Sequence, residues 1–461
     1  MRLNDAKTAD RPRFDRLVVS NVLEWGSGPE RQRLPEFAMP AAGQRFAPED
    51  MALYWGGDRK IVVTRHQMDR EHVADMSAIM GYESLLCTAS PASQPGGSLC
   101  TDLILDEGAL AQVAGLLEEA PADGPVIVEA YASTPEYARL VGELRRRTRR
   151  PLIDRMTPAG YLHMNRSLDS KLQVREYFET ALPGCAAMRL TRAFPVRHGT
   201  DLRAQVQQAL QVLGPAIIKT EFGAGGHALT VIDGTGDARK AVAAFLSSGY
   251  DGDLLIEEFL GADANILSVS YNGIISEDGK TFSLCEGAHF LGSGKYYLGS
   301  HLGVGSMPVD CGPKVHAASE AIAGAVASAG YRGPLNIDFL YRQSDGALFP
   351  LEINPRRTLG ATLADICISL FGLGYEKTVS AVAMHSIPVH RAIRTYPELR
   401  DALLRKGWFG RETGGLVVLP HMVSSLASES AIGLAVLGSD GTSAAEALRE
   451  ITGYLGRRRW R

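Results

Sequence analysis

Three oxygen-bearing side chains in the second half of the chain are the strongest candidates for chemistry. Asp338 opens the segment Asp338-Phe-Leu-Tyr, and Glu352 and Asn354 lie in the later segment Leu-Glu-Ile-Asn-Pro-Arg-Arg. Glu352 and Asn354 are two residues apart, so on a strand their side chains point to the same face. Two carboxylates and an amide oxygen are the hard ligands that Mg²⁺ prefers when it also holds nucleotide phosphates. The pattern therefore predicts a magnesium site.

Arg356 follows Asn354 by two residues and adds a fixed cation beside the predicted metal. A guanidinium in that position suits charge that develops on a phosphoryl group. A turn at 344–346 (Ser-Asp-Gly) joins the two expected strands. An amphipathic hairpin with a solvated acidic face is the alternative interpretation of this segment taken alone.

A glycine-rich turn is the second candidate site. Lys219 ends an apolar segment, and Gly223, Gly225 and Gly226 follow before a second β-branched segment. Glycines let backbone N–H groups approach phosphate oxygens and adopt positive φ. A lysine within a central strand is unusual without a partner, so we expect Lys219 to neutralise phosphate charge. A plain hairpin turn is the alternative.

Two common nucleotide motifs are excluded by their surroundings. The loose GxGxxG/A match that begins at Gly223 requires a helix directly afterwards, but the strand-like Leu229-Thr-Val-Ile follows. A P-loop requires Ser or Thr after its Gly-Lys pair, and here Tyr296 follows Lys295.

Two further segments have acidic or basic residues in useful places. Glu257 and Glu258 end an apolar strand pattern, as in a hinge where a carboxylate and backbone groups bond an adenine edge and another acid bonds the ribose. A strand capped by surface acids is the alternative. Lys171, beside Asp169, is a candidate second phosphate lysine, and an ordinary helix-surface lysine is its alternative.

The elements that must position these residues follow a strand–helix alternation over residues 14–150, which predicts a parallel sheet covered by helices. Its strands are expected at 16–20, 60–64, 83–87 and 125–129, and helices at 69–80 and 108–119. The arginine-rich segment 145–150 is expected to be a solvated linker at a domain boundary. Later helices are expected at 169–180 (with Asp169 as N-cap), 237–247 and 314–329, a glycine-rich loop at 287–305, and a strand from 415.

Composition limits the function classes. The 461 residues suggest about three domains. A formal charge of −4 gives no global attraction for nucleic acid. Six scattered cysteines without a CxxC pair argue against zinc or a disulfide framework and fit a reducing cytosol. No segment has the length of apolar sequence that spans a membrane, so we expect a cytoplasmic protein with no membrane partner.

The order of these segments resembles the ATP-grasp superfamily, and the closing Glu352-Ile-Asn-Pro-Arg356 resembles its metal and phosphate motif. The resemblance implies a pre-ATP-grasp α/β domain (1–155), an ATP-grasp domain (156–372, divided near 260) and a mixed α/β region (373–461). It implies ATP with Mg²⁺, or Mn²⁺, as cofactors. The implied contacts are phosphates for Lys171, Lys219, Gly223, Gly225 and Gly226, adenine for Glu257, Glu258 and Leu260, ribose for Asp263, metal for Asp338, Glu352 and Asn354, and an acyl phosphate for Arg356.

The implied activity is a carboxylate–amine ligase that forms an amide through an acyl phosphate and releases ADP. The terminal regions look most like peptide ligases of the pheganomycin type, which join an amino-acid carboxylate to the α-amine of a peptide. The alternatives are a nucleotide-binding regulatory protein and another ATP-grasp enzyme such as a carboxylase. Oligomeric state is left open. The candidate substrate contacts are Lys295, Tyr296, Ser300, His301 and Arg357.

Overall fold

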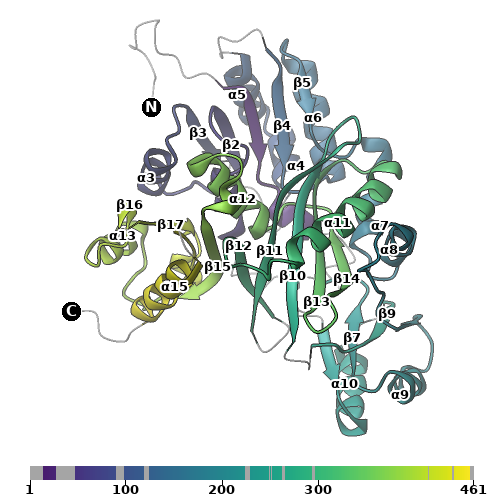
Figure 1. The fold of residues 1–461 in the computed structure, drawn as a ribbon. Helices are drawn as coiled ribbons and strands as arrows, with labels where there is room; N and C mark the ends of the chain where they lie inside the picture. The colour runs from purple at the N-terminus through teal and green to yellow at the C-terminus, as the bar shows by residue number, and fades with distance from the viewer. Residues whose placement is uncertain are drawn as a thin grey trace, which may run out of the picture.

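The computed structural model describes residues 14–26, 47–89, 98–118, 124–223, 229–248, 250, 252–261, 265–292, 296–413, 415–438 and 441–456. These residues form a five-stranded, a four-stranded and a nine-stranded sheet with helices packed on them (Figure 1). In these ranges, no helix combines the length and the apolar character needed to cross a membrane. The six cysteines are all free thiols.

The first sheet is parallel, as the strand–helix alternation predicts, in the order β3-β2-β1-β4-β5. Its strands are β1 (Arg16–Val19), β2 (Lys60–Thr64), β3 (Leu85–Ala89), β4 (Val126–Ala130) and β5 (Leu152–Asp154). Three of the four predicted strands are confirmed closely, and β3 begins two residues later than expected. The accompanying helices are α1 (Val22–Gly26), the 3₁₀ helix η1 (Ala47–Leu53), α3 (Arg70–Met80), α4 (Leu99–Leu105), α5 (Glu107–Glu118) and α6 (Pro135–Arg147).

The prediction that the arginine-rich segment is a linker is wrong in its first half. Arg145, Arg146 and Arg147 form the last turn of α6. Cations are favourable there because the last helical turn carries partial negative charge. Thr134 caps the start of the same helix by accepting the backbone N–H of Tyr137.

The helix expected over 169–180 is two helices, and Asp169 is not its N-cap. Asp169 ends α7 (His163–Asp169), Ser170 is extended, and α8 (Val174–Ala181) begins four residues later. The backbone N–H of Lys171 donates to the carbonyl of Glu221 in a distant segment. That long-range bond holds Lys171 in the break between the helices, so it is no helix-surface lysine. The 3₁₀ turns η2 (Ala159–Tyr161) and η3 (Leu182–Gly184) flank this pair.

The four-stranded sheet lies at the lower right of Figure 1 with its helices beside it. It is antiparallel in the order β6-β9-β7-β8, and Lys219 and Glu257 sit on paired strands. Its elements are β6 (Ala193–Val196), α9 (Leu202–Leu213), β7 (Ala216–Thr220), β8 (Leu229–Ile232), α10 (Thr235–Ser248) and β9 (Leu254–Glu258). α10 confirms the helix predicted at 237–247, whereas α9 was not predicted.

The nine-stranded sheet is antiparallel throughout and runs in the order β14-β13-β10-β11-β12-β15-β18-β17-β16. It continues across residue 372, where we predict a domain boundary. Its strands are β10 (Ile266–Ile275), β11 (Thr281–Gly292), β12 (Tyr296–Gly303), β13 (Gly333–Arg342), β14 (Ala347–Asn354), β15 (Ser380–Pro388), β16 (Gly410–Thr413), β17 (Leu416–Met422) and β18 (Ala431–Gly438). The helices are α11 (Cys311–Ser328), α12 (Leu359–Phe371), η4 (Tyr375–Lys377), α13 (Tyr396–Leu404), α14 (Leu426–Glu429) and α15 (Gly441–Leu455).

The glycine-rich loop predicted over 287–305 is wrong, because its described residues lie mostly in β11 and β12. Glycines are needed there for close strand packing. A Cβ on Gly299 would come within 2.0 Å of the Ala383 carbonyl oxygen, and one on Gly287 within 2.5 Å of the His301 carbonyl oxygen. The described residues of this segment are therefore mostly part of the sheet.

The two faces of this sheet carry different residues because side chains alternate along each strand. Ile337, Phe339 and Tyr341 of β13 point into a core with α8 and α11. Asn336 and Asp338, which alternate with Ile337 and Phe339 along the strand, point to the opposite face, which carries the start of α12. The same alternation on β10 sends Tyr271 to Glu320 of α11 and Asn272 to Thr358 before α12. The polar face of β13 is therefore the face of a candidate site.

Candidate functional site

A cavity of about 510 Å³ lies where the four-stranded sheet, the polar face of the nine-stranded sheet and the start of α12 meet. That volume is in the range of small-molecule sites. The cavity gathers most of the residues that the sequence singles out. Those that line it are Lys171, Lys219, Gly223, Glu257, Glu258, Leu260, Ser300, Asp338, Glu352, Asn354 and Arg356.

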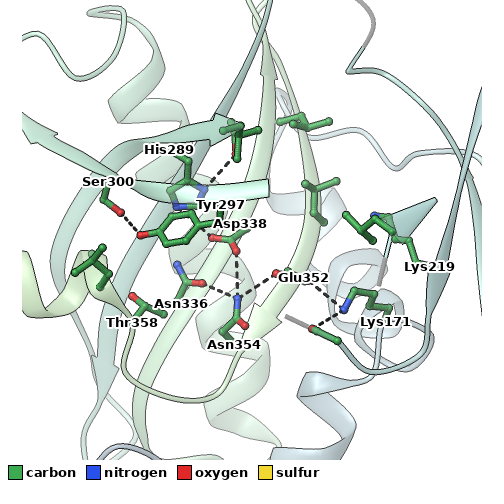
Figure 2. A pocket seen from close by; sticks show the side chains of 18 of the residues that line it. Lys171, Lys219, His289, Tyr297, Ser300, Asn336, Asp338, Glu352, Asn354 and Thr358 are labelled. Atoms are coloured by element: carbon green, nitrogen blue, oxygen red, sulfur yellow. Dashed lines mark hydrogen bonds and ion pairs between the residues drawn. The ribbon is translucent and has the colours of Figure 1, made fainter. Parts of the chain in front are cut away.

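The predicted metal ligands converge as the strand pattern requires. In the β13–β14 hairpin Asp338 pairs with Glu352, and Asn336 pairs with Asn354. The Asn354 amide nitrogen lies 2.8 Å from the Asn336 amide oxygen, 3.2 Å from Asp338 Oδ2 and 3.5 Å from Glu352 Oε1 (Figure 2). The Asn354 amide oxygen instead accepts from Arg356 at 2.8 Å. Asn354 could offer that oxygen to a metal only if its amide turned over.

The two carboxyls have opposite pKa shifts. Burial, together with the neighbouring Glu352 carboxylate, raises the pKa of Asp338 far above its usual value. Burial would raise the pKa of Glu352 as well, but Lys171, Lys219 and Arg356 outweigh it and lower that pKa. Two like charges this close are costly without a cation between them.

The site fits a divalent cation on two observations. Asp338 Oδ1 is buried and has no hydrogen-bond partner among the described residues. The donors are all oxygens, which suits Mg²⁺. The described residues hold no group of three or more His, Cys, Asp or Glu that could bind a metal. Two carboxylates match the way Mg²⁺ sits in nucleotide sites, where phosphates and water complete its coordination.

The two lysines lie on the Glu352 side of the carboxylate pair (Figure 2). Lys171 Nζ is 3.2 Å from Glu352 Oε2 and donates to the Gly223 carbonyl at 3.1 Å. Lys219 Nζ is 2.5 Å from Glu257 Oε2. Both lysines are almost completely buried. Since a buried ammonium is stable only beside negative charge, these side chains are ready to hold an anionic ligand.

The Glu257 carboxylate has more hydrogen-bond and ion-pair partners than a residue that only contacts adenine would need. Besides Lys219, its carboxylate binds Arg175 at 2.8 Å and accepts the Thr191 hydroxyl at 2.8 Å. Burial would raise its pKa, but Lys219 and Arg175 lower it. The Glu258 carboxylate pairs with Arg192 at 2.8 Å. The cavity wall here also includes Phe259 and Leu260, which suit the flat apolar face of a base.

Three of the candidate substrate contacts do not line the cavity, and four of the predicted site residues lie outside the ranges that the structure describes. His301 is bound to Ser380 at 2.7 Å, and Tyr296 is not among the cavity residues. Arg357 is buried elsewhere, as described next. Gly225, Gly226, Asp263 and Lys295 fall outside the ranges that the structure describes. Of the five substrate candidates, Ser300 alone is seen at the cavity.

Arg357 anchors the segment that carries Arg356. Its guanidinium binds Glu129 of β4 at 2.6 Å and Asp365 of α12 at 2.7 Å. Its backbone N–H donates to the Tyr131 carbonyl at 2.9 Å, and Arg356 pairs with Ala132 in a β-bridge. The parallel sheet thereby fixes the position of Arg356, whose guanidinium lies 5.8 Å from the centre of the Tyr131 ring.

Sequence reasoning missed several cavity residues. Thr191, Asn336, His289 and Tyr297 all line it, and Arg175 supports Glu257 from α8. Asn336 could have been found, because it lies two residues before Asp338 and so on the same strand face. Nothing local marks the others, since their partners lie on distant elements.

Comparison with known proteins identifies a fold and no close relative. No family model matches the chain, and no curated protein matches its sequence. Among solved structures, N5-carboxyaminoimidazole ribonucleotide synthetase in complex with ADP aligns with a TM-score of 0.53 at 13% identity, covering 96% of this chain and 97% of that one. Biotin carboxylase from Campylobacter jejuni, in a complex with a β,γ-ATP, aligns at 0.54 and 12%, covering 95% and 90%.

A third similar structure is the biotin carboxylase domain of 2-oxoglutarate carboxylase from Hydrogenobacter thermophilus, with MgADP and bicarbonate. It aligns with a TM-score of 0.51 at 12% identity, covering 95% of this chain and 90% of that one. Agreement over nearly the whole length at such low identity establishes architecture. The chain therefore has the ATP-grasp fold, with an α/β domain before it and a smaller C-terminal region after it.

Proposed function

We propose that this protein is an ATP-dependent carboxylate–amine ligase that forms an amide bond through an acyl phosphate. The observation that carries the proposal is one cavity that brings together two buried lysines, a pair of carboxylates and Arg356, with Lys171 in direct contact with Glu352. ATP-grasp structures of similar architecture were solved with ADP, ATP or MgADP, which supports ATP and Mg²⁺ as the ligands here.

In this proposal each side chain has a defined task. Lys171 and Lys219 hold phosphate oxygens, with Gly223 beside Lys171. Phe259 and Leu260 receive the base, while Glu258 and the buried Glu257 keep the hinge in place. Mg²⁺, held by Asp338, Glu352 and Asn354, would stabilise charge on the transferring phosphoryl group.

Arg356 lies at the junction between phosphate and acyl group. A substrate carboxylate attacks the terminal phosphoryl group, ADP leaves, and the acyl phosphate then carries negative charge beside a fixed guanidinium. Because the backbone bridge to Ala132 and the Tyr131 ring hold Arg356 in place, little reorganisation is needed when the charge develops. An amine next displaces phosphate and forms the amide.

The finer proposal is a peptide ligase that joins an amino-acid-type carboxylate to a peptide α-amine, as in the pheganomycin-type enzymes that the sequence resembles. Cytoplasmic location fits the six free thiols. A carboxylase is the second candidate, because the similar structures are carboxylases and a carboxyaminoimidazole synthetase.

A hydroxylamine trap tests the class of reaction. With Mg-ATP, hydroxylamine and a pool of amino-acid carboxylates, we expect equal amounts of ADP and hydroxamate, measured by coupled absorbance and mass spectrometry. AMP and pyrophosphate would contradict the acyl phosphate. ADP that depends on bicarbonate and gives no hydroxamate would favour the carboxylase, and absence of any ADP would favour a regulatory protein.

Lys219→Met is expected to lower kcat/KM for ATP by about 100-fold, equivalent to roughly 3 kcal/mol. The loss has two causes. A phosphate contact disappears, and Glu257 loses one of its two cationic partners in the described contacts, since only Arg175 remains. Steady-state ADP release measures it. Lys240→Met, on the exposed face of α10 in the same part of the chain, is the matched control and should change kcat/KM less than twofold. Equal effects of the two variants would remove Lys219 from the site.

A further inference from the structure

We propose that the bulge in β15 forms the amine subsite of this enzyme and that His385 accepts the proton of the incoming ammonium. This inference rests on the ligase function proposed above and goes beyond it by locating the second substrate. It assigns a role to the C-terminal region, for which the sequence offered none.

The first observation is the bulge itself. β15 is an interior strand, paired with β12 on one side and β18 on the other. Its pairing with β18 is regular from Ser380 to Met384 and resumes at Ile387, so His385 and Ser386 are left out of the ladder. Ser386 has φ of 54°, a conformation that is uncommon for a residue with a side chain. Bulges re-aim side chains and are frequent beside active sites.

The second observation is where the re-aimed side chains go. His385 and Ser386 line the same cavity as Asp338 and Arg356. The Tyr297 ring lies between the two ends, with its centre 5.4 Å from the ring of His385 and 4.9 Å from that of His289. His289 Nε2 in turn is 3.8 Å from Asp338 Oδ1. A row of rings thus connects the bulge to the predicted metal site.

The third observation is the chemistry of this wall. Among the described cavity residues, the lysines and arginine are Lys171, Lys219 and Arg356, and all three serve the phosphate side. The bulge side carries the His385 imidazole, whose Nδ1 lies 3.1 Å from the Ser386 hydroxyl, and the Glu429 carboxylate, with Met422 as apolar surface. A wall of proton and hydrogen-bond acceptors suits an ammonium group, whereas it offers no cation for a second phosphate or carboxylate.

The other histidines near His385 are held neutral by burial. His421 of β17 is completely buried, and burial lowers the pKa of that imidazole to about 3. Burial also lowers the pKa of His289 to about 4. Tyr297, in contact with the His385 ring, has its hydroxyl bound to Ser300 at 2.7 Å and its pKa raised by burial. Glu429 lines the same wall from α14.

The step follows from the protonation state of the amine. A peptide α-amine has a pKa of about 8, so at neutral pH most of it is ammonium and cannot attack. The His385 imidazole takes one proton and becomes imidazolium. The nitrogen lone pair then attacks the acyl carbon, a C–N bond forms, and the C–O bond to phosphate breaks. The departing phosphate takes the electron pair and the remaining extra proton of the nitrogen.

The test separates the two half-reactions. His385→Gln keeps a polar side chain of similar length but cannot accept a proton. With the amino-acid pool as carboxylate and a dipeptide pool as amine, we expect amide formation at pH 7 to fall about tenfold, because roughly one tenth of an amine with a pKa of about 8 is uncharged at that pH. Formation of hydroxamate should stay within twofold of wild type, because hydroxylamine is uncharged at pH 7 and needs no base. Raising the pH to about 9, where the dipeptide amine is itself deprotonated, should restore most of the amide rate.

His390→Gln is the matched control, because His390 lies in the same C-terminal region, outside the described cavity lining, and accepts the backbone N–H of Ala392. It should leave both products unchanged. Wild-type amide formation by His385→Gln at pH 7, an equal fall in hydroxamate, or no recovery at high pH would each overturn the role of His385. Failure of the ligase proposal would look different, since the wild-type protein itself would then give no hydroxamate.

Discussion

Asp338→Asn is expected to lower ADP release in the hydroxylamine assay by about 1,000-fold or more, a loss of roughly 4 kcal/mol of transition-state stabilisation. The substitution preserves shape and removes one of two carboxylates that face each other across the β13–β14 hairpin. A neutral amide cannot balance a divalent cation, so magnesium would be held by Glu352 and Asn354 alone. Steady-state rates at increasing Mg²⁺ measure the loss.

Folding should not suffer from this change, and thermal unfolding without ligands provides the check. Because burial raises the pKa of Asp338 from 3.8 to about 8 in the folded protein, this carboxyl costs stability at neutral pH, and the cost builds up as pH rises from the unfolded value toward the folded one. Asparagine removes the cost, so Tm should be equal or higher. Asp345→Asn, in the exposed turn of the same hairpin, is the matched control and should keep wild-type activity. Near-wild-type turnover by Asp338→Asn would refute the metal assignment.

Arg357→Met is expected to lower the free energy of unfolding by about 3–5 kcal/mol. Methionine fills much of the same space but leaves Asp365 without its 2.7 Å partner and Glu129 with Arg16 only. Arg357 and Glu129 are buried and the Asp365 side chain is 14% exposed, so neither carboxylate can turn fully to solvent. Urea unfolding measures the change. Arg342→Met removes a surface arginine that pairs with Asp345, and should cost less than about 1 kcal/mol.

Acid unfolding gives an independent measure of the same network. Although burial would raise the pKa of Glu129, Arg357 and Arg16 lower it to about 2. A depressed carboxyl pKa stabilises the fold above the unfolded value near 4.5, and that stability is lost as pH falls toward 2. In Arg357→Met the pKa of Glu129 rises, so its share of stability should disappear at higher pH. An unchanged acid profile would show that Arg16 alone holds Glu129.

The parts of the site that could be predicted are those encoded by local pattern. Asn-Ile-Asp-Phe-Leu-Tyr alternates polar and apolar residues, and that alternation alone assigns Asp338 to one face and Ile337 and Phe339 to the other. The Ser-Asp-Gly turn then sets β14 against β13, and Gly346 supplies the positive φ of 67° that the turn requires. The first sheet was predictable for the same reason, since its strands are short apolar segments between amphipathic helices.

The parts that could not be predicted depend on distant contacts. The segment 287–305 has the glycine content of a loop, and its glycines make sense only once β15 packs against Gly299. Lys171 falls in a helix-like pattern, which a hydrogen bond to Glu221 interrupts. Arg357 looked like a second substrate contact because it adjoins Arg356, but its partners Glu129 and Asp365 come from other elements. Patterns within a short stretch of sequence do not reveal contacts with residues far away in the chain.

The strand order of the large sheet has a consequence for how the protein is made. β12 borders β15, and β15 borders β18, so the middle of the sheet is completed by segments that leave the ribosome late. Until residue 388 has emerged, β12 has one unpaired edge, a template for pairing with other chains. During that time the cavity also lacks the wall that His385 and Ser386 of the β15 bulge form. Termination of the chain between α12 and β15 would leave that edge of β12 unpaired.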